Sequence, residues 1–149
     1  MSLEQPVANF SKNIIYQYHA LNRLGSSYCF CFVHNLNEAA YSKAFQHDLQ
    51  YSGKSTENKI SQIQSILQSN KCDYYILSAL DSIAWLLNLR GNDILYTPLN
   101  LAYVLITPNK KIELFINEEK IKDIKNNLYK FSNFYSLKSI KNFIKNLPL

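Results

Sequence analysis

Glycine and proline are scarce in this chain, and the shortage narrows the class of protein. Three glycines and four prolines among 149 residues are few for an all-β protein, which needs a turn between successive strands. Hydrophobic residues make up 47% of the sequence, so the chain can bury a core and is not disordered as a whole. Long helical patterns and short apolar runs both occur, and together they predict the α/β class.

Cysteine is also scarce, and its use points to a reducing compartment. Cys29, Cys31 and Cys72 are odd in number and form no four-ligand zinc set with the three histidines. No run reaches the ~18 apolar residues that span a bilayer, and the first residues lack the basic and then apolar order of a signal peptide. We therefore expect a cytoplasmic protein that does not contact a membrane.

Arginine is nearly missing, although the chain is basic. The net charge of +5 comes from 16 Lys and Arg against 11 Asp and Glu, and only Arg23 and Arg90 are arginines. Lysines dispersed along helices are typical of a solvated surface rather than of a stripe that reads phosphates. We expect no nucleic-acid partner.

The chain divides near residue 48. Residues 1–47 are an unassigned N-terminal extension or the remnant of a preceding domain, with short strands expected at 14–16 and 28–33 and a helix at 36–45. Residues 48–149 show a clearer order of elements. Gly53-Lys54-Ser55 is not a phosphate-binding loop, because such a loop needs a glycine where Asp48 stands, and a turn into a helix cap explains these residues.

Helical and strand periods alternate after this turn. A helix follows Ser55, with Ile60, Ile63, Ile66 and Leu67 as its apolar stripe and Lys59 among the residues that face water. The run 74–77 is short and apolar, as in a buried strand of the parallel type. A nearly all-apolar helix is expected at 80–89, and it must be buried on several sides or cover a partner. Gly91 suits the left-handed residue that follows a helix.

The second half predicts a hairpin and two more helices. Strands at 101–107 and 111–116 are joined by Pro108-Asn109-Lys110, followed by a helix at 118–130, a short strand near 134–135 and a last helix that ends before Pro148. The order α-β-α-β-β-α-β-α predicts a mixed sheet that contains one antiparallel hairpin and carries helices on its faces.

Four residues around the end of the apolar helix are the candidate functional group: Trp85, Asn88, Arg90 and Asp93. Packing in the core or at a domain interface is favoured for Trp85 over direct contact with a substrate, because a large aromatic residue buries area first. Two roles stay open for Arg90. It is either tied to Asp93 or aimed across a domain boundary at a carboxylate.

The segment 78–94, Ser-Ala-Leu-Asp-Ser-Ile-Ala-Trp-Leu-Leu-Asn-Leu-Arg-Gly-Asn-Asp-Ile, carries a family resemblance. Together with Tyr51-Ser-Gly-Lys-Ser and Tyr96-x-Pro98, it resembles the non-catalytic N-terminal domains of the creatinase/prolidase superfamily, in particular the middle domain of cytosolic Xaa-Pro aminopeptidases. The likeness covers residues 48–149. It implies an α/β domain with a mixed sheet and helices on its faces.

The resemblance also implies a role and partners. Such a domain shapes substrate access and supports assembly, its partner is the catalytic domain of the same polypeptide or a dimer mate, and proline-containing peptides bind only to the full enzyme. Trp85, Asn88, Arg90 and Asp93 would then line the substrate pocket or the domain interface. The binuclear metal, with manganese as the expected ion, would belong to a catalytic domain outside this chain, so the chain alone is expected to hold no cofactor and to be inactive.

A second hypothesis stays open. The chain could be a free-standing protein-binding module or the truncated remnant of such an aminopeptidase. Its basic C-terminal helices or the apolar helix around Trp85 would then hold another protein or an acidic polymer.

Overall fold

The structure is a computed structural model that describes residues 19–21, 42–94 and 96–147. Its main sheet has five strands in the order β1-β3-β5-β6-β7. The strands are β1 (His19–Leu21), β3 (Tyr74–Leu77), β5 (Ala102–Ile106), β6 (Ile112–Ile116) and β7 (Ser132–Tyr135). Only β6 and β7 run parallel, so the sheet is mixed, as predicted. A separate two-stranded sheet pairs β2 (Phe45–Gln46) with β4 (Leu89–Arg90).

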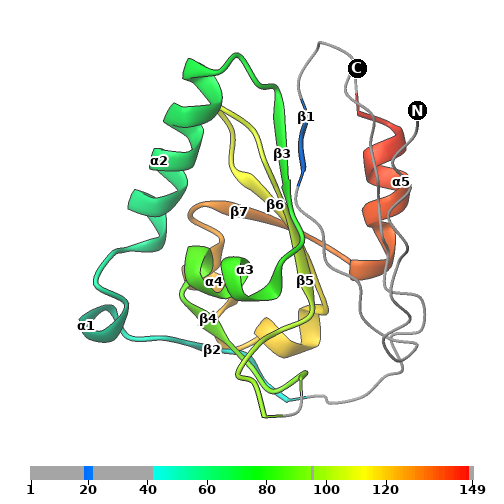
Figure 1. Ribbon diagram of the computed structural model, residues 1–149. Coiled ribbons are helices and arrows are strands. Elements are labelled where there is room, and N and C mark those ends of the chain that lie inside the picture. The colour runs from blue at the N-terminus through cyan, green and yellow to red at the C-terminus, as the bar shows by residue number, and fades with distance from the viewer. Residues whose placement is uncertain (1–18, 22–41, 95, 148–149) are drawn as a thin grey trace, which may run out of the picture.

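Helices cover both faces of the main sheet (Figure 1). The helical elements are α1 (Leu49–Ser52), α2 (Thr56–Ser69), α3 (Leu80–Leu87), α4 (Lys125–Leu128), α5 (Ile140–Lys145) and the short 3-10 turns Glu118–Ile121 and Leu137–Ser139. Helices α2, α3 and α4 pack on one face, and α5 packs on the other. No helix within the described ranges has both the length and the apolar character to cross a bilayer.

The predicted hairpin is confirmed in β5 and β6. Val104 pairs with Leu114 in an antiparallel register, and both side chains are fully buried. The alternation of apolar residues along β6 places Ile112, Leu114 and Ile116 on the face that carries α2 and α3. The fully buried Phe115 faces the other way and packs with Phe143 of α5, with ring centroids 5.2 Å apart.

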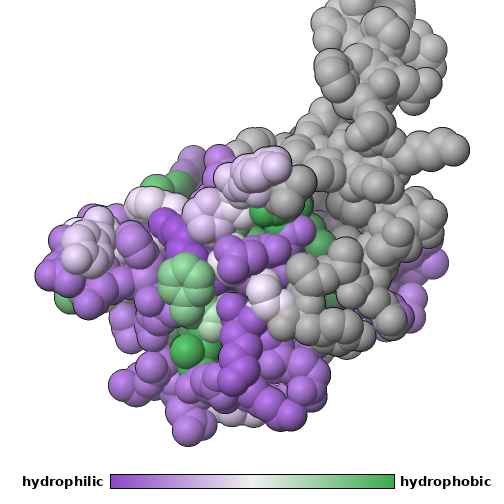
Figure 2. All heavy atoms as spheres, turned by 90° about the horizontal axis from the view of Figure 1, so that it is seen from below, coloured by the Kyte–Doolittle hydropathy of each residue, from purple (hydrophilic) through white to green (hydrophobic). Residues whose placement is uncertain are grey.

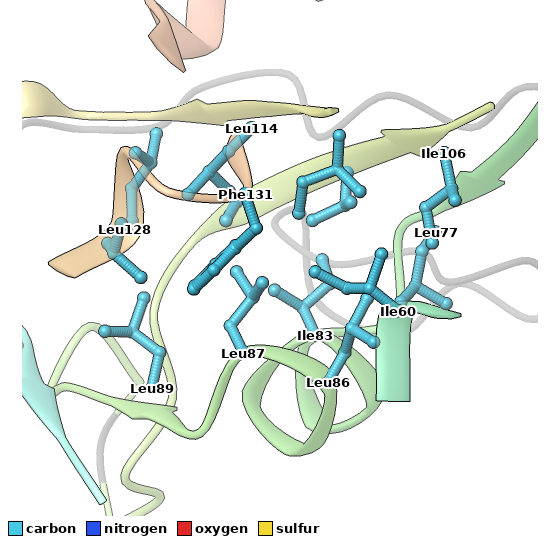
Figure 3. Packing of buried hydrophobic residues seen from close by; sticks show 14 of the residues in the cluster. Ile60, Leu77, Ile83, Leu86, Leu87, Leu89, Ile106, Leu114, Leu128 and Phe131 are labelled. Atoms are coloured by element: carbon cyan, nitrogen blue, oxygen red, sulfur yellow. The ribbon is translucent and has the colours of Figure 1, made fainter. Parts of the chain in front are cut away.

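The larger part of the core lies between the sheet and α2, α3 and α4. Figure 3 shows Ile83, Leu86 and Leu87 of α3 directed at side chains from the strands and from the segment around Leu128 and Phe131. Leu86 and Leu87 are wholly inaccessible to solvent. Because α3 buries most of its circumference, its position is fixed by packing rather than by local propensity.

Two predicted elements differ in the structure. β3 is antiparallel to both neighbours, β1 and β5, although its apolar run indicated a parallel strand. The run reflects helices on both faces of the sheet, which an antiparallel strand can share. The helix expected at 118–130 is split into a 3-10 turn and the short α4, with Ile124 between them at φ −113° and ψ 0°. Ile121, Ile124 and Leu128 all pack in or against the core, so tertiary packing rather than helix propensity sets the backbone at this break.

The end of α3 also differs from the prediction. The left-handed residue is Asn88, at φ 50° and ψ 39°, and not Gly91. Gly91 is required for another reason, because a Cβ atom there would lie 1.9 Å from Oδ1 of Asn100. The strands expected at 14–16 and 28–33 and most of the helix expected at 36–45 lie outside the described residues.

Candidate functional site

The C-terminal turn of α3 gathers three of the four residues singled out in the sequence. α3 begins after Ala79, ends at Leu87, and turns at Asn88 into β4, which carries Arg90. Its buried residues face the core, while Asp81, Ser82 and Trp85 are partly or largely exposed. Trp85 is 51% exposed, so of the two expected kinds of packing the core of this domain is excluded and the domain interface stays a prediction.

Lys59 of α2 holds this corner together. Its Nζ atom lies 4.6 Å from the centre of the Trp85 ring, and it donates hydrogen bonds to the Trp85 carbonyl at 2.7 Å and to Oδ1 of Asn88 at 2.6 Å. The residue is only 1% exposed, whereas the sequence pattern predicted that it faces water. Ile66, predicted to be buried, is 59% exposed instead.

The buried ammonium of Lys59 is placed where carbonyl oxygens of α3 need donors. The end of a helix leaves carbonyl groups without intrahelical partners and carries a partial negative charge. Burial lowers the pKa of the Lys59 amine below its usual value, and the positive charges of Arg90 and Lys54 lower it further. Lys59 therefore supports the corner by hydrogen bonds and by contact with the Trp85 ring, not by an ion pair.

Asn88 is the structural centre of the corner. Its left-handed backbone ends α3, and its Nδ2 donates to the Lys54 carbonyl at 3.0 Å. The carbonyl of Asn88 accepts from the backbone N–H of His47 at 2.7 Å. The residue is 5% exposed and joins the ends of three segments, so it is positioned to hold the corner rather than to meet a ligand.

Arg90 caps the same helix from the other side. Its Nη1 donates to the carbonyls of Ala84 at 2.7 Å and of Leu89 at 3.0 Å. Of the two roles left open for Arg90, the structure excludes the tie to Asp93. The cation that pairs with Asp93 is Lys120, and the Asp93 carboxylate also accepts from the backbone N–H of Leu101 at 2.8 Å.

Asp93 therefore does not contribute to the corner around Trp85. Its side chain is fully inaccessible, and that of Lys120 is 8% exposed, so the pair is a buried ion pair. It fastens the loop after β4 to the 3-10 turn at Glu118–Ile121. The structure thus brings Trp85, Asn88 and Arg90 together and assigns Asp93 to the support of a neighbouring loop.

A cavity of about 320 Å³ opens beside Trp85, between α2, β3 and α3. Its apolar lining comes from Ile63, Leu77 and Leu86, and Tyr75, Asp81, Ser82 and Trp85 complete it. Figure 2 shows, in the view from below, a largely hydrophilic surface on which hydrophobic residues emerge in small patches. The exposed ring of Trp85 therefore forms one wall of a hollow that can take an apolar group.

The described residues do not fit a metal site. Within residues 19–21, 42–94 and 96–147, no three side chains of His, Cys, Asp or Glu come together in a way that could hold an ion. No metal-dependent step can be derived from this part of the chain.

Lys59 is the functional residue that the sequence reasoning missed. It lies four residues before Ile63 and eight before Leu67, both on the apolar stripe of α2. Strict helical spacing would therefore have placed Lys59 on the buried face. The prediction placed Lys59 in water because lysine is charged, although its position in the helix indicated burial.

Comparison with known proteins identifies the class of this domain. Residues 36–148 match the family described as Creatinase/Prolidase N-terminal domain, and the chain belongs to that family. The resemblance seen in segment 78–94 is confirmed.

The relatives are aminopeptidases. Over 87 residues the chain is 47% identical to a "Probable Xaa-Pro aminopeptidase P" of Ajellomyces capsulatus, covering 58% of this chain and 14% of that protein. It is 44% identical to a protein of the same description from Paracoccidioides lutzii, with the same coverage. The chain thus matches only about one seventh of the length of these relatives.

A solved structure shares the fold. The X-prolyl aminopeptidase of Caenorhabditis elegans, described as a cytosolic enzyme with a di-nuclear active site, superposes with a TM-score of 0.66 at 27% identity. The match covers 70% of this chain and 17% of that chain. The α/β fold expected from the resemblance is therefore confirmed as that of a creatinase/prolidase N-terminal domain.

Proposed function

We propose that this domain is the non-catalytic part of a Xaa-Pro aminopeptidase, where it shapes the access of proline-containing peptides and supports assembly. Its membership of the creatinase/prolidase N-terminal family and the descriptions of its relatives support this function. The expected partner is a catalytic domain of the same polypeptide or a dimer mate. The division of the chain between residues 47 and 48 stays a prediction.

The observation that carries the proposal is the state of Trp85. Its ring is half exposed, yet Lys59 and the buried α3 hold it in place. A large aromatic side chain that is fixed before binding loses little conformational entropy on contact, which is typical of residues that dominate interfaces. We assign Trp85 and Arg90 to the face that meets a partner or substrate, and Asn88 and Asp93 to its support.

The metal chemistry belongs elsewhere in this proposal. The neighbour from Caenorhabditis elegans is described as having a di-nuclear active site, and the described residues of this chain offer no matching ligand set. We propose that a catalytic domain supplies the two metal ions, with manganese as the expected element, and that the enzyme is cytoplasmic like that neighbour. A metal-bound water would there act as the nucleophile on the peptide bond.

Kinetics of an aminopeptidase that contains this domain test the proposal. Trp85→Ala and Arg90→Gln should each lower kcat/KM for short Xaa-Pro peptides about tenfold or more. The melting temperature should change little in Trp85→Ala, whereas Arg90→Gln should also lose the stability that its two hydrogen bonds to backbone carbonyls contribute. Lys141→Gln on the exposed side of α5 is the matched control and should leave kcat/KM unchanged. Unchanged kcat/KM in both site variants would refute a role in substrate access.

The isolated chain offers a second test. It should cleave no Xaa-Pro peptide in the presence of manganese, because its described residues provide no site to activate water. Metal-dependent cleavage that co-purifies with the chain would contradict the assignment. The alternative of a free-standing binding module would be favoured if the native chain formed a stable complex with an unrelated protein through Trp85 and showed no association with a catalytic domain.

A further inference from the structure

Three cations gather around the C-terminal turn of α3. The buried ammonium of Lys59 contacts the Trp85 ring, Arg90 bonds the Ala84 carbonyl, and the positive charges of Lys54 and Arg90 are close enough to lower the pKa of Lys59. The ion pairs among the described residues are formed by other side chains: Lys43 with Asp123, Lys120 with Asp93, Lys122 with Glu119, and Lys125 with Glu118.

This arrangement is costly within the isolated domain. A buried cation is normally paired with an acid, because removing a charge from water costs free energy that neutral acceptors only partly return. The negative end of α3 offsets part of that cost. Asp81, about one turn before Trp85 along α3, lines the cavity and forms none of these ion pairs.

Arg90 has donors left for a partner. Nη1 serves the carbonyls of Ala84 and Leu89, and no described residue accepts from Nε or Nη2. The side chain is only partly buried, so this edge of the guanidinium can be reached. Two N–H groups side by side match the two oxygens of a carboxylate.

An apolar group has its own place beside Trp85. The cavity of about 320 Å³ is lined by Ile63, Leu77 and Leu86 at its apolar wall, and the Trp85 ring both lines this cavity and contacts the Lys59 ammonium.

We propose that the surface around Trp85 binds a segment of a partner protein in which an apolar residue and a nearby glutamate or aspartate face this domain. The apolar side chain enters the cavity, and the carboxylate binds the free edge of Arg90 near Lys54. This proposal names a partner surface for the proposed function. It rests on that function only for the assignment of the natural segment to the catalytic domain.

Intrinsic fluorescence tests it on the full chain, because Trp85 is the only tryptophan. The probes are the blocked peptide acetyl-Gly-Leu-Ala-Glu-Gly-amide and matched peptides with Gln or Lys in place of Glu. The Glu peptide should change the emission of Trp85 with saturation, and should bind about tenfold more tightly than the Gln peptide. Its affinity should fall as sodium chloride is raised.

A matched pair of variants separates this surface from the general positive charge of the chain. Lys54→Gln should weaken binding of the Glu peptide severalfold, while Lys141→Gln, which removes the same charge on α5 across the sheet, should not. Neither substitution touches a buried side chain, so both proteins should fold. Circular dichroism confirms that before titration.

Three results would overturn the proposal: equal affinity for the Glu and Gln peptides, preference for the Lys peptide, or equal loss in the two lysine variants. An unchanged emission of Trp85 at millimolar peptide would overturn it as well. Peptide binding requires no catalytic domain, so its failure leaves the kinetic test of the proposed function standing. If the kinetic test fails instead, a positive peptide titration still shows binding at the surface around Trp85, but the natural segment is then not placed in a catalytic domain.

Discussion

Replacing Lys59 by Met tests the central claim about the corner of α3. Methionine keeps the length and apolar stem of the side chain but removes the amine that serves the Trp85 carbonyl and Oδ1 of Asn88. Each buried acceptor left without a donor costs about 1–3 kcal/mol. The variant no longer buries a charge, which offsets part of this loss. We expect a net decrease in the free energy of unfolding of about 2 kcal/mol.

Urea unfolding followed by circular dichroism measures this change. With a slope of about 1–2 kcal/mol per molar urea, the midpoint should fall by about 1–2 M. The emission of Trp85 should change as well, since its ring loses the ammonium 4.6 Å from its centre. Lys138→Met on the far side of the sheet is an exposed control. A variant as stable as the wild type, with unchanged emission, would show that Lys59 does not organise the corner.

The difference in stability between the wild type and Lys59→Met should depend on pH. Burial and nearby positive charge lower the pKa of Lys59 in the folded state, so the unfolded chain binds its proton more tightly. The free energy of unfolding must then rise with pH in the range just below the unfolded pKa of lysine, about 10.4. In that range the unfolded chain still holds the proton that the folded chain has released, so raising the pH favours the folded state. The difference in unfolding free energy between wild type and Lys59→Met should therefore widen from neutral pH toward that range. A constant or narrowing difference would contradict the sign.

Three further substitutions separate buried from exposed features by urea unfolding. Trp85→Ala should lower stability by less than about 1.5 kcal/mol, because half of the side chain is already in water, and a loss above about 3 kcal/mol would mean that the ring is core. Gly91→Ala should cost about 1–3 kcal/mol through overlap with the buried Asn100 side chain, and Asn100→Ala in the same chain should recover part of it. Lys120→Met should cost about 3–5 kcal/mol by leaving the Asp93 carboxylate buried and unpaired. Lys43→Met removes an exposed ion pair and should leave the midpoint unchanged within error; equal effects of the two lysine changes would refute the distinction.

Local pattern in the sequence was sufficient for most elements. The period of two along Ile112, Leu114 and Ile116 predicted a strand that forms a hairpin with β5. The pairing register, and the face of the sheet to which each side chain points, are set by neighbouring residues of the same hairpin. The apolar run of α3 predicted burial on several sides, and segment 78–94 was enough to identify the family. These features depend on residues close together in the chain.

Only the tertiary structure decided the candidate site. Trp85 is exposed because the core-facing side of α3 is filled by Ile83, Leu86 and Leu87, which leaves its ring on the opposite side. Lys59 is buried because the end of α3, 26 residues later, presents a carbonyl to it. Asp93 pairs with Lys120, 27 residues away, rather than with the nearby Arg90. Helical periodicity shows which face a side chain occupies, but the charge or carbonyl that meets it comes from a distant segment, whose place is set by the packing of the whole core.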